Sequence, residues 1–209
     1  MTDNLPPWDD AERAAKRKVW TRTGDDVVVF ENPWIRIETS EVLAPTGHPA
    51  KYGVVRFANK AVGVLPLFDD GTVSLVGQAR FALGTFSWEM PEGGVPYGED
   101  SLDGAKRELR EETGLEAARW QDILQFDMSN SVTDEVAVIY LATGLSEGEG
   151  APDETEAFDY ARVPFMDVLN AVTKGQIRDG LTVAAVLRVY HMAMTGELLP
   201  HLRDAILKN

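Results

Sequence analysis

The chain contains no cysteine and only three histidines among its 209 residues. Without cysteine there is no disulfide, no zinc–thiolate site and no thiol nucleophile. The histidines, His48, His191 and His201, do not have the spacing of a metal-ligand set. Any chemistry must therefore be sought among other polar residues.

Basic residues are also scarce, with 20 Lys and Arg against 34 Asp and Glu, for a net charge of −14. A nucleic-acid-binding protein would usually show a basic patch that neutralises phosphates. The same charge disfavours binding to anionic membrane surfaces. We therefore expect neither partner, and an acidic protein that handles phosphates would need metal ions to offset the repulsion.

Long apolar runs are missing as well. No stretch approaches the ~20 apolar residues of a membrane span, and the first ten residues lack the apolar core of a signal peptide. We therefore expect a cytoplasmic protein. The chain is 44% hydrophobic and 26% charged, as is usual for a globular protein.

The pattern of apolar residues predicts several strands and helices without strict alternation, which favours a mixed sheet covered by helices. An Asp-Asp-Gly hairpin turn is expected at 69–71, and a glycine-rich acidic loop at 144–155. Predicted strands cover 27–31, 35–43, 52–58, 61–68, 72–79, 123–128, 135–142 and 158–163. Outside the segment described next, predicted helices cover 8–22, 165–172 and 181–194.

One predicted helix, after residue 100, carries the most informative feature: three carboxylates within five residues, Glu108, Glu111 and Glu112. Like charges at i, i+4 destabilise an isolated helix by about 0.2–0.5 kcal/mol per pair. A purely structural helix has little reason to collect them, whereas a helix that binds a hard cation does, because Mg²⁺ prefers carboxylate oxygens.

Helical geometry places these acids on an arc beside the apolar stripe of Leu102, Ala105 and Leu109. Ser101 or Asp100 is a suitable N-cap, and Gly114 suits the left-handed position after the last turn. Upstream glycines at 93, 94 and 98 would let backbone carbonyls approach a metal or phosphate closely.

The segment resembles the Nudix box, in which Gly, five residues, Glu and seven residues precede Arg-Glu-apolar-any-Glu-Glu-any-Gly-apolar. Every specified position is matched, by Gly93, Glu99, Arg107, Glu108, Leu109, Glu111, Glu112, Gly114 and Leu115. The resemblance implies the Nudix α/β/α sandwich, an α/β fold with a mixed sheet. It also implies hydrolysis of a nucleoside diphosphate linked to another moiety, with two or three Mg²⁺ (or Mn²⁺) ions per site.

The resemblance assigns roles within the box. Glu108 and Glu112 look like the principal metal ligands, with Glu111 a further ligand or a catalytic group next to the metal. The backbone carbonyl of Glu92 or Gly93 looks like another ligand. Glu99 and Gly114 look structural, and Arg107 either orients the carboxylates or takes part in catalysis.

Residues 28–192 resemble the ADP-ribose pyrophosphatase branch of that family. The similarity implies that Arg80 contacts the phosphates or sugars of the substrate; the alternative is a solvated strand end. Gly93 and Gly94 are further candidates for substrate binding. Among aromatic residues, Trp34, Trp88 and Phe86 are candidates for stacking on a nucleobase or for core packing.

The branch also carries a catalytic base and a metal ligand on an acidic loop, roles that would fall here on Glu154 and Glu156. The alternative is a solvated loop. No proline occurs between Pro96 and Pro152, although the ADP-ribose subgroup typically has one shortly after the box.

The substrate therefore has alternatives. We expect ADP-ribose, cleaved to AMP and ribose 5-phosphate; another nucleotide sugar, a dinucleoside polyphosphate, or a non-catalytic ADP-ribose sensor are the others. The intact set of box acids argues against a sensor.

Residues 1–50 are expected to form an N-terminal helix and β extension with dimer contacts; the resemblance implies that this part crosses onto a partner in a homodimer. Residues 51–209 would form the hydrolase domain.

Overall fold

The computed structural model describes residues 5–148 and 159–208. The chain divides into two compact units after Phe57, so the described residues 5–57 belong to the first unit and the rest to the second. The division falls seven residues after the boundary expected from the sequence. The reason is that strand β4 (Pro49–Phe57) pairs along its whole length with β3 (Ile35–Leu43), and so continues the first unit up to its last residue.

The first unit is a small antiparallel sheet in which β3 pairs with β4, β2 (Val27–Glu31) and β1 (Thr21–Arg22). The predicted bounds of β2 and β3 are confirmed. The predicted helix over 8–22 is wrong for most of its length, because α1 covers only Ala11–Ala15. Thr21 and Arg22 instead pair with the end of β3.

The second unit contains a seven-stranded sheet in the order β11-β6-β5-β10-β9, with β7 added to β6 and β8 added to β5. Strand β10 runs parallel to β5 and the other pairs are antiparallel, so the predicted mixed sheet is confirmed. Its strands are β5 (Asn59–Leu67), β6 (Thr72–Arg80), β7 (Thr85–Glu89), β8 (Glu92–Pro96), β9 (Leu115–Asp127), β10 (Val136–Glu147) and β11 (Asp159–Pro164).

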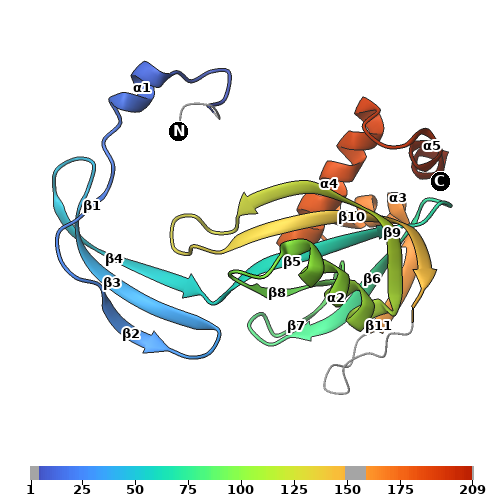
Figure 1. The fold of residues 1–209 in the computed structure, drawn as a ribbon, viewed down its shortest axis with the longest axis horizontal. Helices are drawn as coiled ribbons and strands as arrows, with labels where there is room; N and C mark the ends of the chain where they lie inside the picture. Colours follow the sequence, from blue (N-terminus) through green and yellow to red (C-terminus); the bar gives the residue numbers. More distant parts are fainter. Residues whose placement is uncertain (1–4, 149–158, 209) are drawn as a thin grey trace. The chain divides into compact units, whose positions relative to one another are not determined.

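Helices cover both faces of this sheet because its central strands alternate apolar side chains between two cores. One core joins Val62 and Val64 of β5 to Ala105 and Leu109 of α2 (Ser101–Thr113). The other joins the opposite face to α3 (Phe165–Thr173), α4 (Gly180–Thr195) and α5 (Pro200–Lys208). Figure 1 shows α3, α4 and α5 in orange to dark red and α2 in green.

Helix α2 has the ends that the sequence predicts. Asp100 is the N-cap and its side chain accepts hydrogen bonds from the backbone N–H groups of Leu102 and Asp103. Gly114 ends the helix at φ 68°, a left-handed conformation that glycine adopts without steric cost. Gly104 faces Val95 of β8 so closely that a Cβ would overlap it. The helix therefore packs tightly on β8.

Several elements differ from prediction. Strands β9 and β10 are longer than expected, and β10 extends into the segment predicted as a loop from residue 144. Strands β7 and β8 and helix α5 were not predicted. The short strands β7 and β8 are separated by Met90 and Pro91, and β8 begins with Glu-Gly-Gly, so turn-forming residues obscure any strand pattern. In the described part of the chain, no helix is both long enough and apolar enough to span a membrane.

Candidate active site

The residue 89–94 turn comprises the end of β7, the turn at Met90 and Pro91 and the start of β8, and it packs against the box helix α2. Met90 is fully buried, and its backbone N–H donates to Thr182 Oγ1 of α4 at 3.0 Å. The carbonyl of Pro91 accepts from the N–H of Val64 on β5 at 2.8 Å. The turn is thus held by the sheet and by a helix that lies about 90 residues away in the sequence.

Two box carboxylates contact this turn. Glu112 Oε2 accepts a hydrogen bond from the backbone N–H of Glu92 at 3.0 Å. The Glu108 carboxyl lies so close to Gly93 that a Cβ at residue 93 would overlap it. Glu108 is 9% exposed and Glu112 8%. Glycine at position 93 is therefore required by the close approach of a carboxylate to the backbone.

Arg107 links the acids to one another. Its Nη1 donates to Glu108 Oε1 at 2.8 Å and to Glu111 Oε2 at 3.2 Å, while Nη2 donates to the carbonyl of Gly94 at 3.4 Å. A guanidinium with several fixed donors can orient two carboxylates at once. This geometry favours the orienting role among the two considered for Arg107.

Arg80, at the end of β6, lies against two other acids. Its Nε is 3.0 Å from both carboxylate oxygens of Glu89, and its Nη2 donates to Glu89 Oε2 and, at 2.7 Å, to Glu92 Oε1. The side chain is therefore oriented beside the turn, not extended into solvent.

A second acidic group lies at the residue 89–94 turn and the start of α4, and the sequence did not predict it. Glu89 at the end of β7, Glu92 at the start of β8 and Asp179 before α4 offer carboxylate oxygens within 4.8 Å of one another. Among the described residues, this is the one set of three potential metal-binding side chains that meets this spacing. Asp179 could have been found as an N-cap, but nothing local connects it with residue 92.

Glu92 has an unusual environment within this group. Its Oε2 atom is buried and has no hydrogen-bond partner in residues 5–148 and 159–208. Burial raises the pKa of Glu92 well above its ordinary value, and the negative charges of Asp179 and Glu89 add to the effect, which Arg80 partly opposes. The sequence predicted a role only for the backbone carbonyl of Glu92 or Gly93, whereas the structure also places the Glu92 side chain in a group of acids.

The remaining predicted residues have simpler surroundings. Glu99 is exposed, and its carbonyl accepts from Lys60 Nζ at 3.2 Å. Trp88 packs against the larger core and stacks edge-on with Phe86 at 5.8 Å between ring centroids. Glu154 and Glu156 lie outside the described residues.

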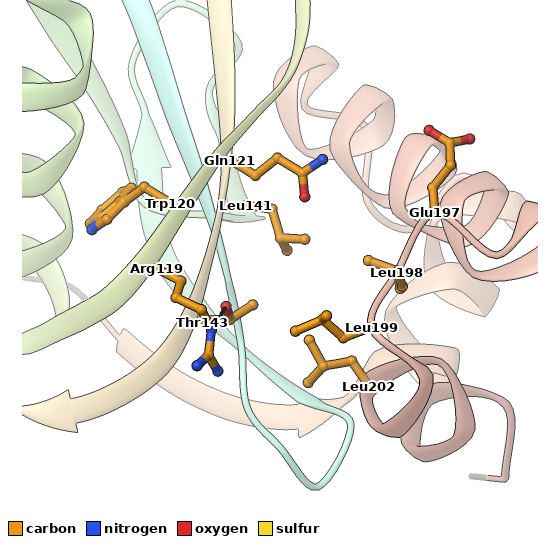
Figure 2. Close-up of a pocket in the computed structure, with 9 residues that line it drawn as sticks. All are labelled: Arg119, Trp120, Gln121, Leu141, Thr143, Glu197, Leu198, Leu199 and Leu202. Carbon is orange, nitrogen blue, oxygen red and sulfur yellow. Dashed lines mark hydrogen bonds between the residues drawn. The ribbon is translucent and has the colours of Figure 1, made fainter.

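A cavity of about 470 Å³ lies elsewhere, between β9, β10 and the α4–α5 connection. Figure 2 shows Gln121, Leu141 and the leucines around its open centre, with the Trp120 ring pointing away. None of the predicted site residues lines it. Its charged lining residues are Arg119 and Glu197, and Glu197 is paired with Arg188. Because the described residues that line the cavity include no group of acids that could hold a metal ion, it is not the candidate active site.

The comparisons with known proteins agree with the box geometry. The family model for the NUDIX domain matches residues 58–186, which include the box helix, the turn and Asp179. The chain therefore belongs to the Nudix family. Nudix hydrolases use divalent metal ions, and the buried oxygens around residues 89–112 provide the donors that such ions prefer.

Similarity to individual proteins narrows the class. The chain is 35% identical over 148 residues to an ADP-ribose pyrophosphatase of Mycobacterium tuberculosis, covering 69% of this chain and 70% of the relative. It is 32% identical over 160 residues to an ADP-ribose pyrophosphatase of Bacillus subtilis, covering 76% and 86%. The chain is a Nudix pyrophosphohydrolase that is similar to ADP-ribose pyrophosphatases.

The fold has a solved counterpart. A crystal structure of an ADP compounds hydrolase superposes with a TM-score of 0.76, covering 88% of this chain and all of the other, at 19% identity. This likeness confirms the predicted Nudix fold.

Proposed function

We propose that the protein hydrolyses ADP-ribose to AMP and ribose 5-phosphate. The observation that carries the proposal is the convergence of the buried Glu108 and Glu112 carboxylates on the turn at residues 92–93. The similarity to two ADP-ribose pyrophosphatases supports the choice of substrate. In the reaction, water adds to one phosphorus and the bridging P–O bond breaks, so each product keeps one phosphate.

Glu108 and Glu112 would hold Mg²⁺, in two or three ions per site, with Glu111 and the backbone carbonyl of Glu92 or Gly93 as further donors. Held by these residues, Mg²⁺ would supply positive charge to the diphosphate and would make water a better nucleophile. The rigid placement of the two glutamates, one against Gly93 and one on the Glu92 N–H, supports this assignment. Arg107 would keep Glu108 and Glu111 oriented while the substrate binds.

Arg80 would contact a phosphate of the substrate. A guanidinium can bind phosphate through two parallel hydrogen bonds, and Glu89 holds this one beside the turn. Glu154 as the base that accepts the proton of the attacking water, and Glu156 as a metal ligand, stay predictions from the sequence. So do the roles of Gly94 and Trp88 in substrate binding and the structural role of Glu99.

The test of the substrate is a panel with Mg²⁺ in which products are identified by chromatography. The panel should contain ADP-ribose, ADP-glucose, GDP-mannose and diadenosine polyphosphates. We expect AMP and ribose 5-phosphate, with the highest kcat/KM for ADP-ribose. Turnover of GDP-mannose alone, or binding of ADP-ribose without cleavage, would contradict the proposal and favour one of the alternative functions.

We also propose that the first unit forms a homodimer contact with a second copy. All five residues of β2 are exposed, including four large apolar side chains, Val27, Val28, Val29 and Phe30. Exposed apolar patches of this kind are typical of interaction surfaces. The variant Val29→Glu should be monomeric in light scattering, whereas Val132→Glu, at an exposed valine of the second unit, should stay dimeric. A monomeric unmodified protein would contradict the proposal.

A cytoplasmic location and the absence of nucleic-acid and membrane partners stay predictions from composition.

A further inference from the structure

Outside the box helix, the acids Glu89, Glu92 and Asp179 form a group whose charges are not balanced by the described residues. Three carboxylates face one cation, Arg80, which contacts Glu89 and Glu92. Glu89 is only 2% exposed. Burying several like charges together is costly unless further cations or hydrogen bonds compensate them.

An independent observation points into the same space. Glu92 Oε2 is buried and lacks a hydrogen-bond partner in the described part of the chain, although Oε1 of the same carboxyl accepts from Arg80. Buried polar atoms of native proteins are nearly always satisfied by protein, water or an ion. Glu92 thus has one oxygen without a described partner, and its carboxyl group lies close to those of Glu89 and Asp179.

The spacing fits an ion bound by oxygen. One carboxylate oxygen from each residue lies within 4.8 Å of the other two. Divalent ions bind oxygens at about 2.1 Å for Mg²⁺ and 2.3–2.6 Å for Ca²⁺, so ligand oxygens on opposite sides of one ion are about 4.2–5 Å apart. Three oxygens cannot all lie opposite one another, and three that are equally spaced around one ion are at most about 3.6 Å apart for Mg²⁺ and about 4.0–4.5 Å for Ca²⁺. The observed limit of 4.8 Å is close to these values, so small side-chain movements would bring the three oxygens onto a common ion.

The elements that carry the three acids are fixed. Asp179 Oδ2 accepts from the N–H of Thr182 at 2.7 Å, and Thr182 Oγ1 accepts from the N–H of Met90 at 3.0 Å. These bonds connect the start of α4 with the turn that carries Glu89 and Glu92. The donor set is therefore assembled by the fold before any ion binds.

We propose that Glu89, Glu92 and Asp179 form a separate binding site for a divalent cation, distinct from the centre proposed on Glu108 and Glu112. The ion neutralises the group and ties the start of α4 to the residue 89–94 turn. Because Glu92 also donates its N–H to Glu112, the two centres share one residue through different atoms. The inference does not depend on the identity of the substrate.

The test counts Mn²⁺ bound to the full chain after chelator treatment, by equilibrium dialysis and electron paramagnetic resonance. The key variant is Asp179→Asn, because asparagine is also a good N-cap and can keep the bond to Thr182 while it removes the charge. Asp100→Asn is the matched control, since it makes the same change at the N-cap of α2. We expect Asp179→Asn to weaken the binding of one Mn²⁺ ion at least tenfold. The control should bind Mn²⁺ as tightly as the unmodified protein does.

The variant Glu108→Gln/Glu112→Gln separates the two centres. This double variant should still bind the Mn²⁺ ion whose binding Asp179→Asn weakens. Adding Mn²⁺ should therefore still raise the Tm of the double variant. This Tm measurement gives a result even if Asp179→Asn does not fold. Loss of all Mn²⁺ from this variant, or unchanged binding by Asp179→Asn, would overturn the inference. If the Glu108→Gln/Glu112→Gln variant instead lost no Mn²⁺, the metal centre in the proposed function would fail while the second site stood.

Discussion

Two groups of acids meet at the residue 89–94 turn, and they are assembled in different ways. Glu108, Glu111 and Glu112 lie within five residues on one helix, where the helical repeat alone places them together. Glu89, Glu92 and Asp179 come from two short strands and the start of α4, up to 90 residues apart in the chain. The first group is visible as a motif, whereas the second exists only after the sheet and α4 have packed.

The difference also concerns how the carboxylates are satisfied. Glu108 and Glu111 share Arg107, and Glu112 accepts a backbone N–H. In the second group, Arg80 contacts two acids and one oxygen of Glu92 has no described hydrogen-bond partner. The carboxylates of the helical group therefore have hydrogen-bond partners, whereas the second group keeps a carboxylate oxygen that can still bind a cation. Each of the following changes tests one side of it.

The largest effect is expected from Glu112→Gln on the box helix. The amide oxygen can still accept the Glu92 N–H, but the charge that would hold a metal is lost. We expect kcat for ADP-ribose to fall by about 10³-fold, which equals about 4 kcal/mol in the activation barrier. Glu116→Gln, an exposed acid just after the helix, is the control and should keep its rate. Wild-type turnover by Glu112→Gln would show that the helical group is not the catalytic centre.

A smaller effect is expected from Gly93→Ala, which tests the contact between helix and turn. The added methyl would overlap the Glu108 carboxyl, and overpacking of this kind costs about 1–3 kcal/mol. We expect kcat/KM to fall by about 10- to 100-fold with a lowered Tm. Gly53→Ala is a matched control, because the nearest atom to its Cβ would be 4.0 Å away. An unaffected Gly93→Ala enzyme would mean that Glu108 can work at a greater distance from the turn.

Thr182→Val tests the link between the turn and α4. Valine has the shape of threonine but cannot accept from the buried N–H of Met90, and an unsatisfied buried donor costs about 1–3 kcal/mol. We expect a loss of this size in the free energy of unfolding measured with urea. Thr173→Val, at an exposed threonine that ends α3, should change stability by less than about 0.5 kcal/mol. Equal losses in the two variants would argue against a special bond at Met90.

The sequence predicted the elements that local patterns determine, and it did not predict those that depend on long-range packing. Periodicity located β2, β3, β6, α2 and α4 to within about one residue, and the caps Asp100 and Gly114 fixed both ends of α2. It failed where short segments owe their conformation to distant partners. Strand β8, Glu92–Pro96, contains two glycines and ends in a proline, but pairs with β5 across the sheet.

The candidate site shows the same limit. The spacing of Glu108, Glu111 and Glu112 predicted that they would share one side of α2, and Arg107 is bonded to two of them. The sequence did not show that Arg80 would lie against Glu89, because that pair depends on how β6 and β7 are placed. Nor did it connect Asp179 with Glu92. Long-range packing decides both contacts, and no local pattern encodes it.

The smallest effect is expected from Glu197→Gln, at the opposite end of α4 from Asp179. Hydrogen bonds from Arg188 and then Thr195 lower the pKa of Glu197 from 4.5 to about 2. Because the folded-state pKa is the lower one, the carboxylate stabilises the fold above pH 4.5 and loses this contribution as the pH falls toward 2. The free energy of unfolding of the variant should therefore lie slightly below that of the unmodified protein at pH 6, and the gap should narrow toward pH 3. Glu116→Gln, which has no ion pair with any described residue, should show no such trend. A gap that widens in acid would contradict the assigned direction, and would remove the contrast between this exposed, satisfied acid and the buried Glu92.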